Sequence, residues 1–353
     1  MYVPLVARAN IRNVRRLLRG APGTLQETAF DEEILCPEEI SSAIPAAFLP
    51  GQLDRITGTQ IETSVPLELE LLVRNTAVHA ATIAYHIRNA VLYEGAIYAG
   101  ALKYPICSPP SFPTQSEDRE FGTVGLTSAW LGSQYFGHWL KDDCLRYLLA
   151  EAFGKPLSVM RAPLSNHMAE YAGYFGQDWT TTSRARIDHL VIYQDFSQNS
   201  FKKQRYAALQ ARLAANLPAG PASLVYLRRG NSGEIRTIEN EDGIIASLSN
   251  RGFSVVDLTS DRLADIAGPL MNARLVVSLE GSHLSHCWFP PNGKGGILTL
   301  QPPDRFTAIH RSYTECMSAK YGIVVGTKRG PATTYFEPNE ILRTVDLMLK
   351  ECA

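Results

Sequence analysis

The sequence predicts an α/β protein in which a β-rich N-terminal portion precedes two lobes, each a parallel sheet with helices on both faces. The chain has 353 residues, 45% of them hydrophobic, which is enough for more than one core. Strand-like and helix-like segments alternate from about residue 121 onward, as parallel sheets require. The Pro/Gly-rich break LPAGPAS, at 217–223, divides this alternation into two sets. We therefore predict three parts, 1–120, 121–218 and 219–353.

The first part is predicted to begin irregular and then to become β-rich. Residues 22–65 are rich in Pro, Glu and turn-forming residues and have few periodic runs, so we expect an irregular connection. Residues 66–105 show alternating or β-branched runs broken by Asn, Gly and His, which is typical of antiparallel strands. The stretch SPPSFPTQSEDRE, at 108–120, is predicted to be a loop.

The two alternating sets have the pattern of Rossmann-like lobes, which we expect to face a cleft. Apolar residues at helical spacing predict the helices, and short β-branched runs predict the strands. The predicted strands are 157–160, 186–194, 224–229, 253–258, 274–279 and 295–303, and the predicted helices are 138–153, 200–217, 240–252, 261–273, 282–289 and 339–352. Such sheets bind ligands at the carboxyl ends of their strands, so the loops there are the first candidates for a site.

Charge and cysteine content exclude several classes of protein. The formal net charge is −1, which gives no support for a nucleic-acid partner. None of the six cysteines has CxxC spacing, which disfavours a zinc ribbon, a redox motif or a disulfide framework. Reduced thiols in a cytoplasmic protein are expected instead.

Residues 5–19, LVARANIRNVRRLLR, form a basic amphipathic pattern with Ile11, Val14 and Leu18 on one helical face. Arginines interrupt every apolar stretch, so we expect no signal peptide, and no apolar run reaches membrane-spanning length. Two interpretations stay open. The helix could lie on the anionic inner face of a membrane, or it could pack on the protein's own surface.

The stretch VVSLEGSHLSH, at 276–286, raises the question of a metal site or a hydrolase nucleophile. Glu280, His283 and His286 have i, i+3, i+6 spacing and could bind catalytic zinc, although the HExxH pattern is absent. A serine nucleophile elbow at Ser282 would need glycines at 280 and 284, where the chain has Glu280 and Leu284.

A third interpretation of the same turn is an anion pocket. Gly281 would let the backbone approach a phosphate, and the helix predicted to follow would offer free N–H groups. Ser282 and His283 could donate hydrogen bonds to its oxygens. A purely structural βα turn has the same appearance, so this pattern alone does not decide.

The loop in LVYLRRGNSGEIRTIENEDG, at 224–243, favours the anion pocket. A strand ends at Arg228 and Arg229, and Arg236 precedes a helix that opens with Asn240 and Glu241. The planar guanidinium donates two parallel hydrogen bonds to a phosphate, so two or three arginines could hold a diphosphate without a metal. Solvated loop arginines, with Asn240 as a plain helix N-cap, are the structural alternative.

This loop and NARLVVSLEGSHLSHCWF together resemble the C-terminal half of family 61 glycosyltransferases. Arg229, Arg236, Asn240, Glu241 and Gly281 fall on the positions of the family pattern. The upstream segment YFGHWLKDDCLRYLLA, at 135–150, is also similar to the family. Its matching residues are His138, Asp142 and Arg146.

The chain departs from the family pattern in the same turn. Glu280 stands where the family usually has His, and His283 stands where it has a second glycine. Thr299 occupies a position where the family tends to carry an acidic residue. These differences bear on the identity of the donor and on activity.

The resemblance implies a GT-B fold and an inverting, metal-independent transfer from a nucleotide sugar, a UDP-sugar by first expectation, to a saccharide acceptor in surface polysaccharide synthesis. It implies that Arg229, Arg236 and the turn at Gly281 stabilise the leaving diphosphate. His138 and Asp142 are the candidates for the base or for a base and its partner. No cofactor is expected, and an oligomer stays open. The alternatives are a catalytically impaired nucleotide- or sugar-binding relative and a zinc-dependent hydrolase using Glu280, His283 and His286.

Overall fold

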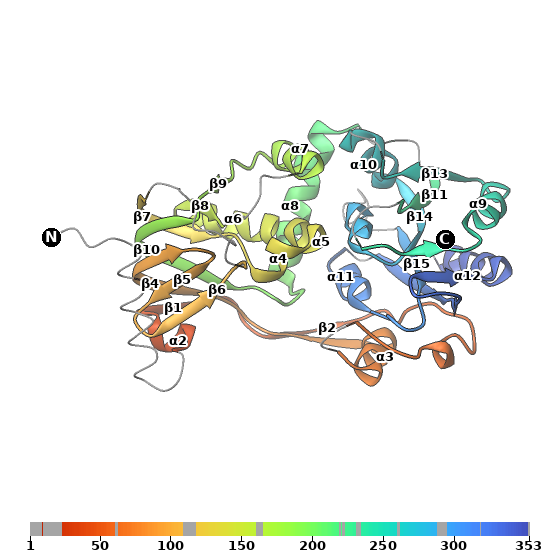
Figure 1. Cartoon of the computed structure of the whole chain (residues 1–353), viewed down its shortest axis with the longest axis horizontal. Helices are drawn as coiled ribbons and strands as arrows, with labels where there is room; N and C mark the ends of the chain where they lie inside the picture. The colour runs from red at the N-terminus through yellow and green to blue at the C-terminus, as the bar shows by residue number, and fades with distance from the viewer. Residues whose placement is uncertain are drawn as a thin grey trace. The chain divides into compact units, whose positions relative to one another are not determined.

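The computed structural model describes residues 9, 23–60, 63–108, 118–159, 165–218, 220, 223–230, 234–259, 262–287, 295–317 and 319–351. The chain forms two compact units: unit 1 is Met1–Glu39 with Ala80–Arg205, and unit 2 is Ile40–His79 with Tyr206–Ala353 (Figure 1). Apart from Ala9, the predicted amphipathic helix 5–19 lies outside the described residues. No described helix is both long enough and apolar enough to cross a membrane.

Unit 1 is built on a mixed sheet of eight strands, ordered β6-β5-β4-β10-β7-β8-β9, with β1 also paired to β4. The long strands β4 and β10 are antiparallel to each other, whereas β10, β7, β8 and β9 run parallel to one another. The strands are β1 (Asp31–Cys36), β4 (Thr82–Tyr93), β5 (Ala96–Ala99), β6 (Leu102–Pro105), β7 (Arg119–Leu126), β8 (Lys155–Ser158), β9 (Thr180–Thr181) and β10 (Arg184–Gln194).

The helices of unit 1 follow the apolar spacing of the sequence. Leu145, Leu149 and Ala150 bury one side of α6, which packs on β7, β8 and β10. The helices are α2 (Leu25–Thr28), α4 (Trp130–Gln134), α5 (Phe136–His138), the π-helical segment η2 (Trp139–Asp143), α6 (Cys144–Phe153), α7 (Asn166–Phe175) and the start of α8 (Ser200–Asn216). The predicted helix 138–153 is thus present, with one wide turn in it.

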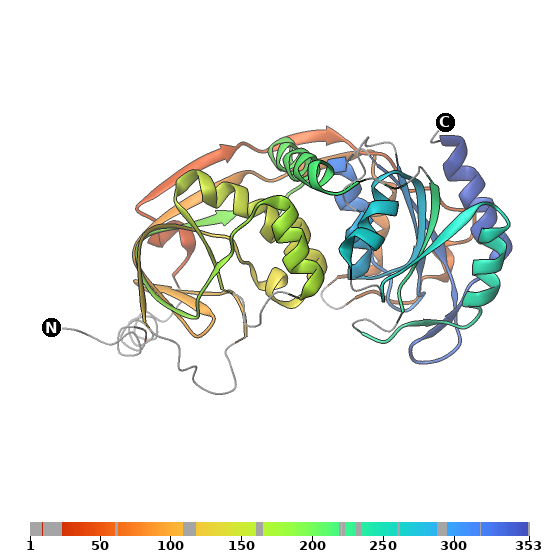
Figure 2. The same ribbon diagram turned by 90° about the horizontal axis from the view of Figure 1, so that it is seen from above.

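Unit 2 contains an all-parallel sheet of five strands, ordered β13-β11-β14-β15-β16. Helices α9 and α12 lie on one side of it and α10 on the other, as Figure 2 shows. The elements are β11 (Ser223–Arg228), α9 (Glu241–Ser249), β13 (Phe253–Asp257), α10 (Leu263–Met271), β14 (Ala273–Leu279), the 3-10 turn η3 (Ser282–Cys287), β15 (Gly296–Gln301), α11 (Ile309–Met317), β16 (Lys320–Val325) and α12 (Pro338–Glu351).

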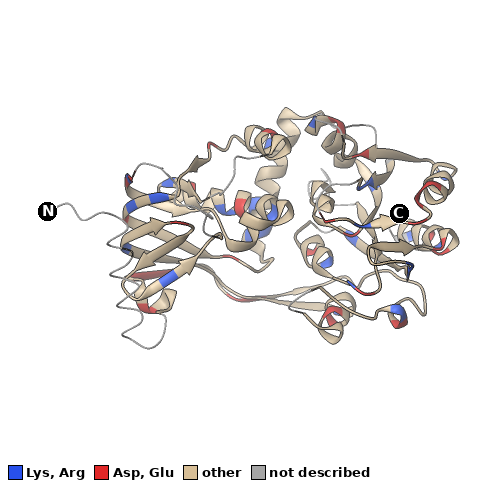
Figure 3. Ribbon diagram, viewed as in Figure 1, with Lys and Arg blue, Asp and Glu red and all other residues tan. Residues whose placement is uncertain are grey.

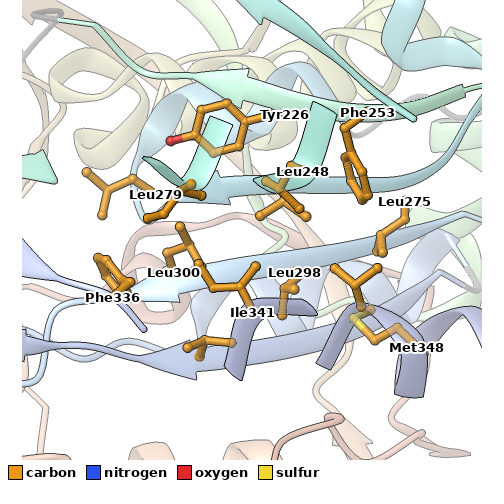
Figure 4. Packing of buried hydrophobic residues seen from close by; sticks show 14 of the residues in the cluster. Tyr226, Leu248, Phe253, Leu275, Leu279, Leu298, Leu300, Phe336, Ile341 and Met348 are labelled. Carbon is orange, nitrogen blue, oxygen red and sulfur yellow. The ribbon is translucent and has the colours of Figure 1, made fainter. Parts of the chain in front are cut away.

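The core of unit 2 lies between the sheet and its helices α9 and α12. Leu298 and Leu300 of β15 face Ile341 of α12 (Figure 4). Leu248 of α9 and Met348 of α12 belong to the same buried cluster. Each large apolar side chain buried in this way contributes about 1.5–3 kcal/mol to folding. This packing fixes the sheet, and hence the positions of the loops at the carboxyl ends of its strands.

Two predictions for the N-terminal portion are wrong. Residues 22–65 are not only irregular, because β1 pairs with β4 and β2 (Glu39–Ser42) pairs with β3 (Thr76–His79). Residues 65–73 form the helix α3 (Val65–Val73) and not a strand, because Pro at the start of PLELELLV favours a first helical turn. The smaller elements are η1 (Leu53–Arg55), β12 (Thr237–Ile238), β17 (Thr327–Lys328) and β18 (Thr333–Tyr335).

The compact units are divided differently from the three predicted parts. Strands β4–β6 share one sheet with β7, β8 and β10, so residues 80–120 belong to the same unit as 121–205. The segment 40–79 belongs instead to unit 2, where Ala47 pairs with Gly322 beside β16. The α/β class is correct, with a mixed sheet in unit 1 and a parallel sheet in unit 2.

Candidate active site

The predicted site residues fall into one group in each unit, and unit 2 holds the basic one. In chain order, the parallel sheet of unit 2 runs 2-1-3-4-5, so the strand order reverses between β11 and β14. Leu227 of β11 is in register with Ser278 of β14, so the loops that follow these strands start side by side. Open α/β sheets bind their ligands at such a switch point.

Arg229 and Arg236 both reach from the loop after β11 to the turn after β14. Arg229 Nη1 donates to the Glu280 carbonyl oxygen at 3.0 Å, and Arg236 Nη1 donates to the same oxygen at 2.8 Å. Arg229 Nη2 also donates to the Glu234 carbonyl at 2.6 Å. Burial, together with the charge of Arg236, lowers the pKa of Arg229 to about 10, so it stays a cation at neutral pH.

The Glu280 side chain is buried and already engaged. It forms an ion pair with Arg236, and His310 Nε2 lies 3.8 Å from its Oε1. Burial raises the pKa of this carboxyl, but the nearby His310 ring and the charge of Arg236 outweigh burial and lower it. Glu280 is therefore a carboxylate that neutralises part of the basic cluster, which makes it a poor candidate for ribose hydroxyls.

Gly281 is required where the turn passes under Arg229. Its φ of +155° is rare for residues with a side chain, and an added Cβ would overlap Arg229 Nη1. His283 Nε2 lies 2.8 Å from Ser278 Oγ, which donates its own proton to the Leu227 carbonyl. The ring must therefore donate from Nε2. Burial and the charge of Arg229 hold the pKa of His283 well below its usual value, so the ring is neutral.

Three predicted donor residues do not join this cluster. Asn240 bonds the backbone of Phe336 through both side-chain atoms and does not cap α9. Glu241 accepts from Tyr226 Oη at 2.8 Å and from Arg228 Nε at 3.3 Å. Ser282 is exposed. The short helix predicted at 282–289 is described as η3, a six-residue 3-10 helix.

The zinc arrangement receives no support from the side-chain geometry. Glu280 is directed to Arg236 and His310, whereas His283 is bonded to Ser278. Across the ranges that the structure describes, no three His, Cys, Asp or Glu side chains are arranged to hold a metal ion. The described cysteines, Cys36, Cys107, Cys144, Cys287 and Cys316, are buried.

Unit 1 holds the second predicted pair in a chain of three polar groups. His138 Nδ1 lies 2.8 Å from Asp142 Oδ2, and Lys202 Nζ donates to Asp142 Oδ1 at 2.7 Å. The π-helical turn at 139–143 carries Asp142, and such turns are frequent at functional sites. Asp142 thus orients the imidazole through Nδ1, and Nε2 is the ring nitrogen that Asp142 does not contact.

Other buried ion pairs surround this chain and hold its elements together. Asp143 bonds Arg146 at 2.9 Å and accepts from the Ala129 N–H, and Asp195 forms a two-bond pair with Arg205. Figure 3 shows acidic and basic positions next to one another near α5 and α6. Arg146 Nη1 also donates to the Thr127 carbonyl at 3.1 Å. The contacts of Arg146 therefore stabilise the fold of unit 1 around the His138–Asp142 pair.

The sequence argument missed Lys202, Glu234, Arg305 and His310. Lys202 shares the buried face of α8 with Tyr206, Leu209 and Leu213, at helical spacing. A lysine on an otherwise apolar helical face indicates a buried charge with a partner, so the sequence did hold a signal for Lys202. Arg305 follows β15 by a few residues, at the carboxyl edge where the site was expected. The sequence holds no comparable signal for Glu234 or His310, because their partners come from distant loops.

Comparison with solved structures yields no fold assignment. A flavo di-iron protein variant from Thermotoga maritima is 9% identical with a TM-score of 0.28, and a flavoprotein from the same organism is 10% identical with a TM-score of 0.26. Each alignment covers 77% of this chain and 65% of that chain, so the chain spans less than two thirds of their length. TM-scores this low carry no argument about function. No curated protein sequence matches the chain.

A family model matches part of the chain. Residues 136–297 match the model described as Glycosyltransferase 61. The matched range includes His138, Asp142 and Lys202 of unit 1 and the arginine-bearing loop of unit 2. Over these residues the chain is similar to glycosyltransferase family 61, and this similarity indicates a glycosyltransferase.

Proposed function

We propose that this chain is an inverting, metal-independent glycosyltransferase that moves a hexosyl or pentosyl group from a nucleotide sugar to a saccharide acceptor. One observation carries the proposal beyond the family match. Arg229 and Arg236 converge on the turn after β14, at the switch point of a parallel sheet. A diphosphate is the ligand that such convergent guanidinium groups suit best. UDP-sugars are the first donors to test, and a GT-B arrangement is part of the proposal.

The proposed reaction is a direct displacement at the anomeric carbon. The acceptor oxygen forms the new bond while the bond to the diphosphate oxygen breaks, and the diphosphate leaves with the electron pair. Arg229 and Arg236 stabilise that developing negative charge. Because Arg229 is buried and Arg236 nearly so, their charges are little screened by water and act strongly on the leaving group.

We assign His138 as the base and Asp142 as the residue that positions it. Asp142 binds Nδ1 of His138, which fixes the tautomer and leaves the Nε2 lone pair to accept the acceptor's proton. Asp142 itself is held on its other oxygen by Lys202, so it is less suited to take up a proton. The arrangement supports His138 over Asp142 as the base.

The biological setting is proposed from the class alone. We propose action at the cytoplasmic side of a membrane in surface polysaccharide synthesis, with residues 5–19 as the contact to an anionic surface. Vesicle sedimentation with and without anionic lipid tests this point, with a chain lacking residues 1–19 as control. Binding that is equal for both chains would contradict the contact.

The first experiment is a thermal-shift series of the whole chain with UDP, GDP, CMP and TDP, each with and without EDTA. A nucleotide at a hundred times its dissociation constant stabilises by about 2.7 kcal/mol. A shift with one nucleotide that survives EDTA, lost in Arg229→Gln, supports the proposal and names the donor class. No shift with any nucleotide, together with destabilisation by EDTA, overturns it in favour of a zinc hydrolase.

Turnover separates the enzyme from an impaired binding relative. Release of free nucleotide from the matching nucleotide sugar is measured for the wild type and for His138→Gln. We expect the substitution to lower kcat/KM by about 10²–10⁴ while nucleotide affinity stays the same. Nucleotide binding without any release by the wild type, over a panel of sugars and acceptors, would identify a binding relative.

A further inference from the structure

A third arginine stands beside the two already described. Arg305, in the loop after β15, has Nη1 2.7 Å from Glu234 Oε2. The same Glu234 oxygen lies 3.4 Å from Arg236 Nη2. One carboxylate therefore bridges two guanidinium groups that come from different loops at the carboxyl edge of the sheet, as a phosphate oxygen would.

The two carboxylates of this cluster are held very differently. The side chain of Glu280 is 4% exposed, whereas that of Glu234 is 67% exposed. The backbone of Glu234 is fixed, because Arg229 Nη2 donates to its carbonyl at 2.6 Å. Its side chain can rotate into solvent without any movement of the main chain, and an exposed ion pair of this kind is weak.

We infer that Glu234 is an internal stand-in for a phosphate group, and that Arg305 is the third arginine of an anion site from which a diphosphate displaces Glu234. The inference rests on the proposed function for its ligand class. With Glu234 in place, the three arginines and two carboxylates leave one positive charge on these side chains. With Glu234 rotated away, two positive charges remain, which match the charge of a bound diphosphate more closely.

The contacts predict opposite effects for the two side chains. Removing the Glu234 charge removes a competitor, so Glu234→Gln should tighten anion binding by about two- to fivefold, the range expected for an exposed ion pair. Removing Arg305 removes charge-assisted hydrogen bonds, so Arg305→Gln should weaken binding by about tenfold or more. Glu280→Gln is not an equivalent test, because Glu280 holds Arg236 and His310 in the interior.

The test is isothermal titration of the whole chain with UDP, GDP and inorganic pyrophosphate at constant ionic strength. Glu239 and Arg329, 3.7 Å apart and about half exposed, provide matched controls for the loss of one charge. Glu239→Gln and Arg329→Gln should leave all three affinities unchanged. Thermal unfolding of each variant confirms that it is folded, which is expected because Glu234 is mainly exposed.

The outcomes separate this inference from the proposed function. Tighter binding by Glu234→Gln and weaker binding by Arg305→Gln support the inference. If the wild type binds a nucleotide and neither variant differs from its control, the inference is wrong and the proposed function stands. If pyrophosphate shows the expected pattern while no nucleotide binds, the anion site stands and the nucleotide-sugar proposal fails. Binding of neither ligand by wild type and Glu234→Gln overturns both.

Discussion

Lys202 and Asp142 form an ion pair inside unit 1, with Lys202 Nζ 2.7 Å from Asp142 Oδ1 and none of the Lys202 side chain exposed. Burial of Asp142 disfavours its charge, but Lys202 and the hydrogen bond from His138 outweigh burial and hold the pKa of Asp142 well below its usual value. Asp142 therefore remains a carboxylate at neutral pH. Asp142 binds Lys202 of α8 with one oxygen and His138 with the other, so the contact with α8 restricts the orientation of the imidazole.

We expect Lys202→Met to lower both stability and activity. Breaking one side of a buried ion pair costs about 3–5 kcal/mol, because the remaining charge loses its partner. Urea unfolding measures this cost, and Lys203→Met, at the exposed neighbouring position, is the control. In the folded fraction, kcat should fall more than KM changes, and the Nδ1 proton resonance of His138 should broaden or vanish. An unchanged resonance and kcat would show that Lys202 has only a structural contact.

Asp142 should also account for part of the loss of folding stability at acid pH. Its pKa is lower in the folded than in the unfolded chain, so its contribution to stability is present above the unfolded pKa of about 3.9 and is lost as pH falls below it. Asp142→Asn should therefore lose less unfolding free energy between pH 7 and pH 3 than the wild type, by about 1 kcal/mol. Asp188→Asn, on the exposed side of β10, controls for the missing charge. Equal acid losses in Asp142→Asn and the wild type would contradict the prediction.

Arg229→Lys should not behave as a conservative change. The guanidinium donates to two carbonyls, those of Glu280 and Glu234, and an ammonium cannot keep this fork. We expect a loss of about 2–3 kcal/mol of stability together with at least tenfold weaker nucleotide binding. Arg228→Lys, whose residue is 40% exposed and pairs with Glu241, should cost under about 1 kcal/mol. Similar losses at both positions would contradict a special function for Arg229.

Gly281 and Gly243 should respond in opposite directions to alanine. At Gly281 the new Cβ would overlap the Arg229 guanidinium and the backbone would be strained, so we expect a loss of about 2 kcal/mol or more and weaker nucleotide binding. At Gly243 nothing lies within 4 Å of the new Cβ, and the site is an exposed turn of α9. Alanine there should stabilise by about 0.5–1 kcal/mol. Differential scanning calorimetry of Gly281→Ala and Gly243→Ala, each compared with the wild type, measures both changes in stability.

Much of the fold was predictable because it depends on local periodicity. The helices α8 and α12 and the strands β10, β11 and β14 lie where the sequence predicted them, since each carries its own apolar period. The prediction failed at 65–73, where PLELELLV alternates like a strand but begins with proline and folds as a helix. It also failed at 31–42, where the polar strands β1 and β2 are stabilised by their partners β4 and β3 rather than by their own pattern.

The sequence by itself determined the α/β class, the parallel sheet of unit 2 and the residue types of the site: arginines after β11, a glycine turn after β14 and a His–Asp pair one helical turn apart. Only the tertiary structure decided which of these side chains meet. It directs Arg229 and Arg236 to one carbonyl, binds Asn240 to Phe336 and Glu241 to Tyr226, and brings Lys202 to Asp142 from 60 residues away. The physical reason is that helical and strand periods are read within a few neighbouring residues. The partner of a buried charge is instead set by where the packed core places a distant loop or helix.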